Sequence, residues 1–384
     1  MDPAAELTHC EKLRNEYFRN LIVCVLCFTT WLTSCGTDPV AGDYEAPKLG
    51  TIQVEAEAFR ARIACPVSGN LSGVSGYGVR FGAGSMKEVP AQLEEGVLKA
   101  EVKALCADTD YSVEVFLTNG AELLTGMSSF RTEQGPATVE IPDGVFRRYV
   151  LAHFDENDDG VLTEPEAMRI YEIAVCTDSI YSLQGIEKMG NLLRLEASGS
   201  EGGKGVLSEI DFSGNPLVVY CNLNDNHVRT IDLSPLKNLQ ELCFATNPVT
   251  ALDFSHNPRI SALYLNNLPL EELPDMTFLP LVSLHIDHTA RFFSEDYLHN
   301  FPLLEGLNMS YYEGRTIDFS ANNRLAALWA GGCPNLEELD LTATSRLVIL
   351  YIRDCPRLRR VYVRAGTKFE ELETDDHTEL IYVE

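Results

Sequence analysis

The sequence predicts a β-rich solenoid, built mostly from strand and loop coils, that follows a β-sandwich and a short helix-loop-helix. Three observations predict this fold class. An apolar phrase of the form L-x-x-L-x-L occurs seven times between residues 218 and 352, at intervals of 21 to 23 residues. Short runs of alternating apolar and polar residues fill the segment 49–133. Between these two regions, an acidic loop joins two helix-like runs.

The composition is that of a folded chain that is long enough for more than one domain. Of its 384 residues, 45% are hydrophobic and 23% are charged, as in an ordinary globular protein. The formal net charge is −27. Because binding to nucleic-acid phosphates requires a basic face, no nucleic-acid partner is expected. The sequence has no G-x-S-x-G, H-E-x-x-H or P-loop motif, so an enzyme is not expected either.

Residues 1–35 have the features of a lipoprotein signal peptide. The run Leu21–Leu32 is nearly all apolar, follows basic residues that include Lys12 and Arg19, and is too short to cross a bilayer. The Leu-Thr-Ser-Cys-Gly sequence at its end resembles a bacterial lipobox, which implies that Cys35 is lipidated. The exported protein would then be anchored to the outer membrane of a Gram-negative bacterium, facing the exterior. In the alternative, a plain signal peptide, Cys35 is incidental.

Residues 36–48 contain Gly, Pro and Asp without periodicity and are expected to form a tether. From 49 to 133, runs of period two are separated by Gly, Asn and Asp turns, which predicts an antiparallel β-sandwich. The spacing of Leu, Thr and Val around Tyr111 resembles that of fibronectin type III-like modules. This resemblance implies a spacer or docking module in which Tyr111 packs at a corner. Cys65 and Cys106 are candidates for a disulfide, which the sequence alone leaves open.

Residues 144–174 are predicted to form a helix-loop-helix around an acidic loop. Residues 155–166 match the pattern D-x-[DN]-x-[DN]-G-x5-E at every specified position. The loop resembles a single EF-hand, which implies a structural Ca²⁺ site with these ligands: Asp155, Asn157, Asp159, the carbonyl of Val161, Thr163 or a water molecule, and Glu166. A lone extracellular site of this kind has a dissociation constant on the order of 10⁻⁴–10⁻³ M. The alternative is an acidic loop that only caps a helix.

Residues 175–384 carry the recurring phrase and are predicted to form the solenoid. A single coil cannot bury its own apolar face, so stacking must bury the leucines in one continuous core. The phrase resembles that of leucine-rich repeat proteins, whose Asn/Cys position is occupied here by four residues: Asn226, Asn247, Cys333 and Cys355. The asparagine side chains are expected to satisfy backbone groups where the coil bends, as a ladder down the stack.

A second phrase, such as Val-Arg-Thr-Ile-Asp-Leu at 228–233, recurs half a period out of step with the first. It predicts a second extended edge in each coil. On that edge it places a column of aspartates: Asp211, Asp232, Asp253, Asp318 and Asp340. Carboxylates stacked in register repel one another unless they accept hydrogen bonds or bind cations. A turn-stabilising role is favoured here over a cation site.

In the first phrase, the residue between the last two apolar positions points away from the core, because a strand alternates its faces. Neighbouring strands lie about 4.8 Å apart, so Tyr264, His285, Trp329 and Tyr351 are expected to line a strip on the order of 20 Å long. Exposed aromatic rings with polar edges suit recognition of a protein surface or of sugar rings. The alternative is that each ring packs on flanking side chains.

Together these features predict a lipid-anchored cell-surface binding or adhesion protein that recognises a protein ligand through the aromatic strip. The alternative is a glycan-binding accessory lipoprotein of a carbohydrate-uptake system, in which the same rings stack on sugars. A third reading is a purely structural envelope component, in which the rings are packed and bind nothing.

Overall fold

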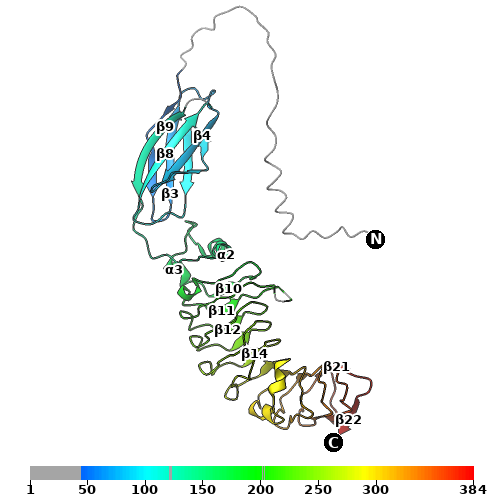
Figure 1. Cartoon of the computed structure of the whole chain (residues 1–384). Helices are drawn as coiled ribbons and strands as arrows, with labels where there is room; N and C mark the ends of the chain where they lie inside the picture. The colour runs from blue at the N-terminus through cyan, green and yellow to red at the C-terminus, as the bar shows by residue number, and fades with distance from the viewer. Residues whose placement is uncertain (1–44, 121–122, 201, 203) are drawn as a thin grey trace, which may run out of the picture. The chain divides into compact units, whose positions relative to one another are not determined.

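The structure is a computed structural model, and it describes residues 45–120, 123–200, 202 and 204–384 (Figure 1). The predicted signal peptide, the predicted lipidation site Cys35 and most of the predicted tether lie outside the described residues. Among the residues that are described, no helix has the length and apolar character needed to cross a membrane.

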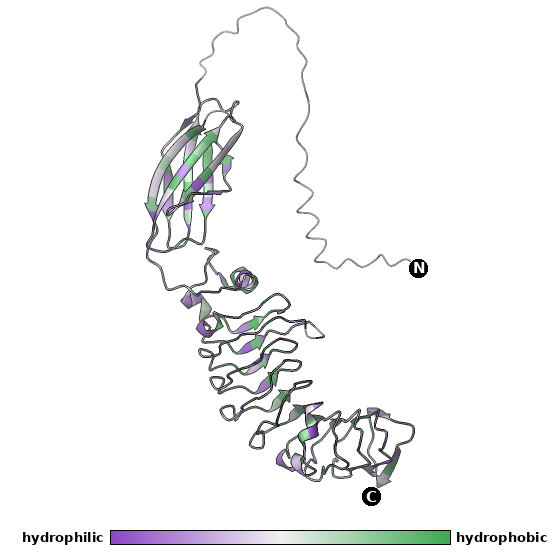
Figure 2. Ribbon diagram, viewed as in Figure 1, coloured by the Kyte–Doolittle hydropathy of each residue, from purple (hydrophilic) through white to green (hydrophobic). Residues whose placement is uncertain are grey.

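The first described module consists of two antiparallel sheets. One sheet has the order β1-β3-β7-β6, with β2 also paired to β3, and its strands are β1 (Lys48–Leu49), β2 (Gln53–Ala56), β3 (Ala61–Ser68), β6 (Gln92–Glu94) and β7 (Val97–Val102). The other has the order β5-β4-β8-β9, with β4 (Gly76–Gly82), β5 (Lys87–Val89), β8 (Asp110–Thr118) and β9 (Leu123–Arg131). Alternate residues of the long strands are buried, as the period of two predicts, and apolar and polar positions alternate along the ribbon (Figure 2).

Tyr111 packs in the corner position that the sequence predicts for it. Its ring is buried and stacks on Phe130 at a centroid distance of 5.5 Å. The backbone N–H of Cys106 donates a hydrogen bond of 2.9 Å to the Tyr111 hydroxyl. Cys65 is buried and Cys106 is exposed, and both are free thiols in the structure.

The helical segment is shorter than the sequence suggests. Helix α2 (Gly144–Phe154) begins at Asp143, whose carboxylate accepts the N–H groups of Val145 and Phe146. Helix α3 (Glu164–Ala167) is a single turn with Thr163 at its N-cap. The solenoid sheet starts soon afterwards with β10 (Glu172–Ala174), inside the range expected for the helix-loop-helix.

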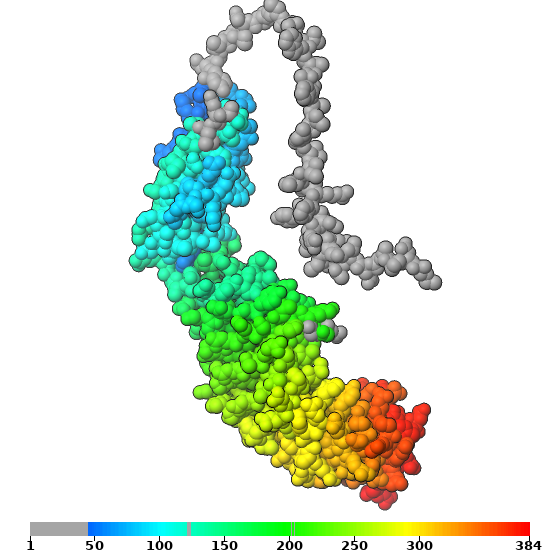
Figure 3. Space-filling model, viewed as in Figure 1, coloured from blue at the N-terminus to red at the C-terminus, as the bar shows by residue number. Residues whose placement is uncertain are grey.

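The solenoid is organised by a ten-stranded parallel sheet with one short strand per coil (Figure 1). In the space-filling view, the atoms of successive coils form one continuous surface from green to red (Figure 3). After β10, its strands are β11 (Arg194–Glu196), β12 (Tyr220–Asn222), β13 (Glu241–Cys243), β14 (Ala262–Tyr264), β15 (Ser283–His285), β16 (Gly306–Asn308), β17 (Ala327–Trp329), β19 (Ile349–Ile352) and β21 (Glu371–Thr374). The register places Leu263, Leu284 and Leu307 side by side, all fully buried. The predicted stacking of the apolar positions is therefore confirmed.

The second extended edge forms strands only in the last coils. There β18 (Glu338–Leu341), β20 (Arg360–Arg364) and β22 (Glu379–Val383) make a parallel sheet. In earlier coils of the described chain this edge has only isolated bridges or short 3-10 turns, η1 (Ile186–Lys188), η2 (Thr289–Phe292) and η3 (Tyr297–Asn300). The prediction of two extended edges in every coil is thus wrong. In the earlier coils, side chains make the hydrogen bonds between neighbouring coils at this edge. In the last coils, backbone groups make them.

Two asparagine ladders supply these side-chain bonds. In the predicted ladder, the amide of Asn247 donates to the carbonyls of Leu223 and Phe244, at 2.9 and 3.2 Å. At the same position further on, the thiols of Cys333 and Cys355 both lie near the carbonyl of Ala330, at 3.1 and 3.2 Å. A second ladder, which the sequence reading missed, consists of buried amides that each donate to two carbonyls of the preceding coil: Asn215, Asn257 and Asn322.

Candidate functional site

Four aromatic side chains form a continuous ridge on the outward face of the ten-stranded sheet. Tyr264 is paired in register with His285, and Trp329 with both Asn308 and Tyr351. The Tyr264 and His285 rings are 4.7 Å apart, and the His285 and Trp329 rings 5.6 Å apart, between centroids. We call Tyr264, His285, Trp329 and Tyr351 the aromatic ridge. Their predicted alignment is confirmed by the register, and their binding role stays a prediction.

A lane of small residues runs beside the aromatic ridge. Two residues before Tyr264, His285, Asn308 and Trp329, the strands β14 to β17 carry Ala262, Ser283, Gly306 and Ala327 in register. Alternation along a strand puts these residues on the same face as the ridge. The rings are therefore bordered on this side by short side chains, which leave the flank of the ridge accessible to a ligand.

A second aromatic pair, missed by the sequence reading, lies just beyond the strands. The rings of His288 and Tyr311 stack at a centroid distance of 4.0 Å, and Tyr311 is 47% exposed. Both residues have a left-handed backbone, with φ of 57° and 64°. The same conformation recurs at this repeat position in Asp225, Thr246, Asn267, Gly332 and Asp354. An alignment of the coils with one another would have placed His288 and Tyr311 at the same repeat position. The alternation of apolar and polar residues along the strands gives no sign of the pair.

The ridge is uncharged at neutral pH. Burial lowers the pKa of His285 below its ordinary value, and the Asp287 carboxylate opposes this shift only in part. Neutral His285 between two rings completes an apolar surface with polar edges. Such surfaces contribute strongly to binding when a partner covers them.

The acidic loop between α2 and α3 has the hydrogen bonding expected of the motif. The Asp155 carboxylate accepts the N–H groups of Asp159 and Gly160, at 3.1 and 2.8 Å, and Gly160 has φ of +88°. Glu166 is buried and accepts the N–H and hydroxyl of Thr163 in a capping box. Burial raises the pKa of Asp159, and the neighbouring carboxylates of Asp155 and Glu166 contribute to the same shift.

Carboxylates alone do not form a metal site in this loop. Across the described residues, no group of three His, Cys, Asp or Glu side chains is gathered closely enough to hold a metal ion. A bound Ca²⁺ would therefore depend on the amide of Asn157, the carbonyl of Val161 and Thr163 as well as on the acids. The mixed set of carboxylate, amide and carbonyl oxygens still matches the ligands that Ca²⁺ prefers.

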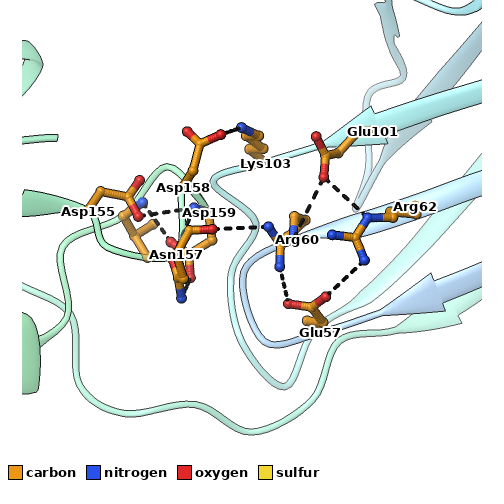
Figure 4. A network of polar contacts seen from close by, with 10 residues as sticks. Glu57, Arg60, Arg62, Glu101, Lys103, Asp155, Asn157, Asp158 and Asp159 are labelled. Carbon is orange, nitrogen blue, oxygen red and sulfur yellow. Dashed lines mark hydrogen bonds and ion pairs between the residues drawn. The ribbon is translucent and has the colours of Figure 1, made fainter. Parts of the chain in front are cut away.

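The same loop makes polar contacts with residues next to the ends of β3 and β7 in the sandwich module (Figure 4). The N–H of Ala104 donates to the carbonyl of Asp159 at 2.7 Å, and the guanidinium of Arg60 donates to the carbonyl of Asn157 at 3.1 Å. Lys103 forms an ion pair with Asp158, which lowers the pKa of that carboxyl. The backbone of the loop is thus held at several points outside the loop itself.

The aspartate column has the turn-stabilising role that was predicted for it. In each case the carboxylate accepts the backbone N–H of the residue two positions on, at 2.7 to 2.9 Å: Asp211 from Ser213, Asp232 from Ser234, Asp253 from Ser255, Asp318 from Ser320 and Asp340 from Thr342. These bonds lower the pKa of Asp232 and Asp253. The carboxylates are engaged by the backbone, which removes the need for a cation.

Three features characterise the solenoid: one short parallel strand per coil, a period of 21 to 23 residues and a buried Asn/Cys ladder. The solenoid fits a leucine-rich repeat fold. Neither a protein-family model nor a curated protein sequence matches this chain.

Solved structures of leucine-rich repeat proteins are similar to the chain at low identity. The functional domain of InlJ from Listeria monocytogenes, which includes a cysteine ladder, is 18% identical, with 62% of this chain and 70% of that chain covered and a TM-score of 0.36. Internalin InlF from Listeria monocytogenes is 15% identical over 65% of this chain and 94% of that chain, with a TM-score of 0.42. The leucine-rich repeat domain of APL1B is 15% identical over 50% and 66% of the two chains, with a TM-score of 0.33.

Proposed function

We propose that this chain is a cell-surface binding protein, and not an enzyme, that captures a protein ligand on the aromatic ridge. The observation that carries the proposal is the contiguity of the ridge. Tyr264, His285 and Trp329 contact one another in sequence across four strands, and Tyr351 continues the column. Contiguous, partly exposed aromatic surface of this kind is typical of the centre of protein interfaces.

The packing of the rings favours a protein ligand over a glycan. A sugar ring stacks on an open aromatic face, whereas Tyr264 and Trp329 each lie close to the ring of His285 between them. Faces turned toward one another are less accessible, and the ridge presents ring edges and flanks instead. Protein side chains pack well against such edges, in tilted and edge-on arrangements.

Capture of ligand from surface extracts tests the proposal when it is done with paired variants. The double variant Trp329→Ala with Tyr351→Ala is expected to lose at least about 2 kcal/mol of binding free energy, or roughly thirtyfold in affinity, because it removes two of the four rings of the ridge. The control Tyr181→Ala removes a ring that is 65% exposed but lies outside the ridge. A protein retained by wild type and by Tyr181→Ala, but lost by the double variant, is the expected result. Equal retention by all three variants contradicts the proposal, as does a glycan array on which the ridge binds oligosaccharides.

We also propose that Cys35 carries a lipid that anchors the protein to the outer membrane, facing the exterior. The proposal is supported by the short apolar run and the lipobox-like residues before Cys35. Incorporation of labelled palmitate into the full chain, and its absence from Cys35→Ser, is the expected result. Label that persists in Cys35→Ser contradicts the anchor.

We further propose that the acidic loop binds one structural Ca²⁺ ion through Asp155, Asn157, Asp159, Thr163 and Glu166, with the carbonyl of Val161. The support is the left-handed Gly160, together with the buried Asp159, whose pKa is raised by burial and by the nearby carboxylates of Asp155 and Glu166, a repulsion that a cation would relieve. Bound Ca²⁺ would supply a rigid set of oxygen contacts and no chemistry.

Calorimetric titration with Ca²⁺ tests this site. A dissociation constant on the order of 10⁻⁴–10⁻³ M is expected for the full chain. Asp155→Ala should abolish the heat of binding. Asp158→Ala is the matched control, because its carboxylate is in the same loop but pairs with Lys103. Loss of binding in Asp158→Ala alone, or heat that persists in Asp155→Ala, would show that the ligands are misassigned.

A further inference from the structure

The outward positions of the ten-stranded sheet have a strong charge imbalance. The register defines two outward columns, one that contains the aromatic ridge and one that contains the small-residue lane. The charged members of both columns are five carboxylates and one guanidinium: Glu172, Glu196, Glu241, Glu371, Glu373 and Arg194. They occupy the ends of the sheet, and the ridge occupies the stretch between them.

Each end of the sheet has one carboxylate in an ion pair. Arg353 pairs with Glu373 at 3.3 Å at one end, and Arg194 pairs with Glu172 at 3.7 Å at the other. No Lys, Arg or His of the described chain forms an ion pair with Glu196, Glu241 or Glu371. Glu196 and Glu241 lie close together, on β11 and β13 on either side of β12, immediately before the ridge begins on β14, whereas Glu371 lies on β21 at the other end.

Neutral groups hold Glu196 in place without cancelling its charge. The Tyr220 hydroxyl donates to one of its oxygens at 3.0 Å, and the Asn222 amide donates to the other at 2.7 Å. Burial raises the pKa of Cys243 to about 12, and the Glu241 and Glu196 carboxylates contribute to the same shift. This end of the face therefore combines a fixed carboxylate, a second carboxylate and a negative local potential next to an apolar surface.

We infer that the ligand is a polypeptide segment that places apolar side chains on the aromatic ridge and a Lys or Arg side chain between Glu196 and Glu241. The inference rests on the proposed function and adds the chemical class of the ligand. A cation beside two uncompensated carboxylates and the Tyr220 ring gains both charge pairing and cation–π attraction. Arg194 already occupies one face of Tyr220, at 4.0 Å from the ring centroid, which shows that the ring accepts a guanidinium.

The spacing of the face sets the spacing of the ligand residues. From β13 to β17 is four strand separations of about 4.8 Å. An extended segment rises about 3.3 Å per residue, so six residues cover the same distance, and an even spacing keeps both side chains on one face. A basic residue six positions before an apolar residue therefore places the cation near Glu241 while the apolar side chain reaches Trp329.

Matched synthetic peptides test this inference on the full chain by calorimetry. The probes are twelve-residue repeats of Lys-Ser-Leu-Ser, Ser-Ser-Leu-Ser and Glu-Ser-Leu-Ser, which keep both residue types on one face, together with the neutral oligosaccharide laminarihexaose. The lysine peptide is expected to bind at least about tenfold more tightly than the serine peptide, to weaken as salt increases, and to exceed the glutamate peptide by a larger factor. Trp329→Ala should weaken the binding of both the lysine and the serine peptides.

The decisive variant is Glu196→Gln with Glu241→Gln, which keeps the size and one acceptor oxygen of each side chain and removes the charge. This variant should reduce the affinity for the lysine peptide to that for the serine peptide. The control variant, Glu271→Gln with Glu272→Gln, changes two exposed positions outside the strands and should leave the affinity for the lysine peptide unchanged. Serine and lysine peptides that bind equally through Trp329 would overturn the inference and leave the proposed function standing. Binding of laminarihexaose without binding of any peptide would overturn both.

Discussion

Replacing Leu284 with Ala is expected to lower the free energy of unfolding by about 2–5 kcal/mol. Leu284 is fully buried at the middle of β15, in register with Leu263 and Leu307 on the neighbouring strands. Backbone hydrogen bonds hold both neighbouring coils, so they cannot move in to fill the space that the side chain leaves. The cavity persists, and its cost adds to the lost transfer free energy. Denaturant unfolding followed by circular dichroism measures the change.

Leu372→Ala is the matched control for this prediction. Leu372 occupies the equivalent position on the last strand, β21, but is 42% exposed because no further coil is described beyond it. The control should change the free energy of unfolding by less than about 1 kcal/mol. Similar losses for both leucines would mean that the coils do not share one continuous core.

Gly214→Ala is expected to cost about 3 kcal/mol, at the upper end of the range for overpacking. A Cβ atom built on Gly214 would lie 1.7 Å from the carbonyl oxygen of Glu187, in the 3-10 turn η1 of the preceding coil. A backbone carbonyl cannot swing aside as a flexible side chain can, so the two coils must separate locally. Thermal unfolding of the variant measures the loss.

The repeat itself supplies the control for Gly214. The equivalent positions one and two coils later are Pro235 and His256, so this place tolerates a side chain wherever η1 is not its neighbour. His256 is exposed, and His256→Ala should leave the melting temperature within a few degrees of wild type. A stable Gly214→Ala variant would show that η1 does not pack as described.

The parts of the structure that could be predicted are those that covalent geometry dictates. The 21-residue period requires stacked coils, and strand alternation then places Tyr264, His285, Trp329 and Tyr351 in one column. The packing of Tyr111 is implied by the resemblance of its surroundings to fibronectin type III-like modules, and the Cys106 N–H donates to its hydroxyl.

The parts that could not be predicted depend on tertiary contacts. The pair His288 and Tyr311 requires a left-handed backbone at residues that usually avoid it, and only the fixed turn of each coil imposes that conformation. The missed ladder consists of Asn215, Asn257 and Asn322 and does not have an asparagine in every coil. A search for a residue that recurs in every coil therefore does not find it. The absence of strands from the second edge of the earlier described coils follows from such side-chain bonds, which compete with backbone pairing.

Hydroxyl-radical footprinting of the full chain, alone and with a captured protein, tests the central claim most directly. The claim is that the coils stack in register and present one aromatic ridge to a protein ligand. The expected result is that the ligand protects Tyr264, Trp329 and Tyr351 together, while Tyr181 and Tyr382, which are 65% and 54% exposed and lie outside the ridge, react as before. Protection of Tyr181 or Tyr382 with an unchanged ridge would contradict the account.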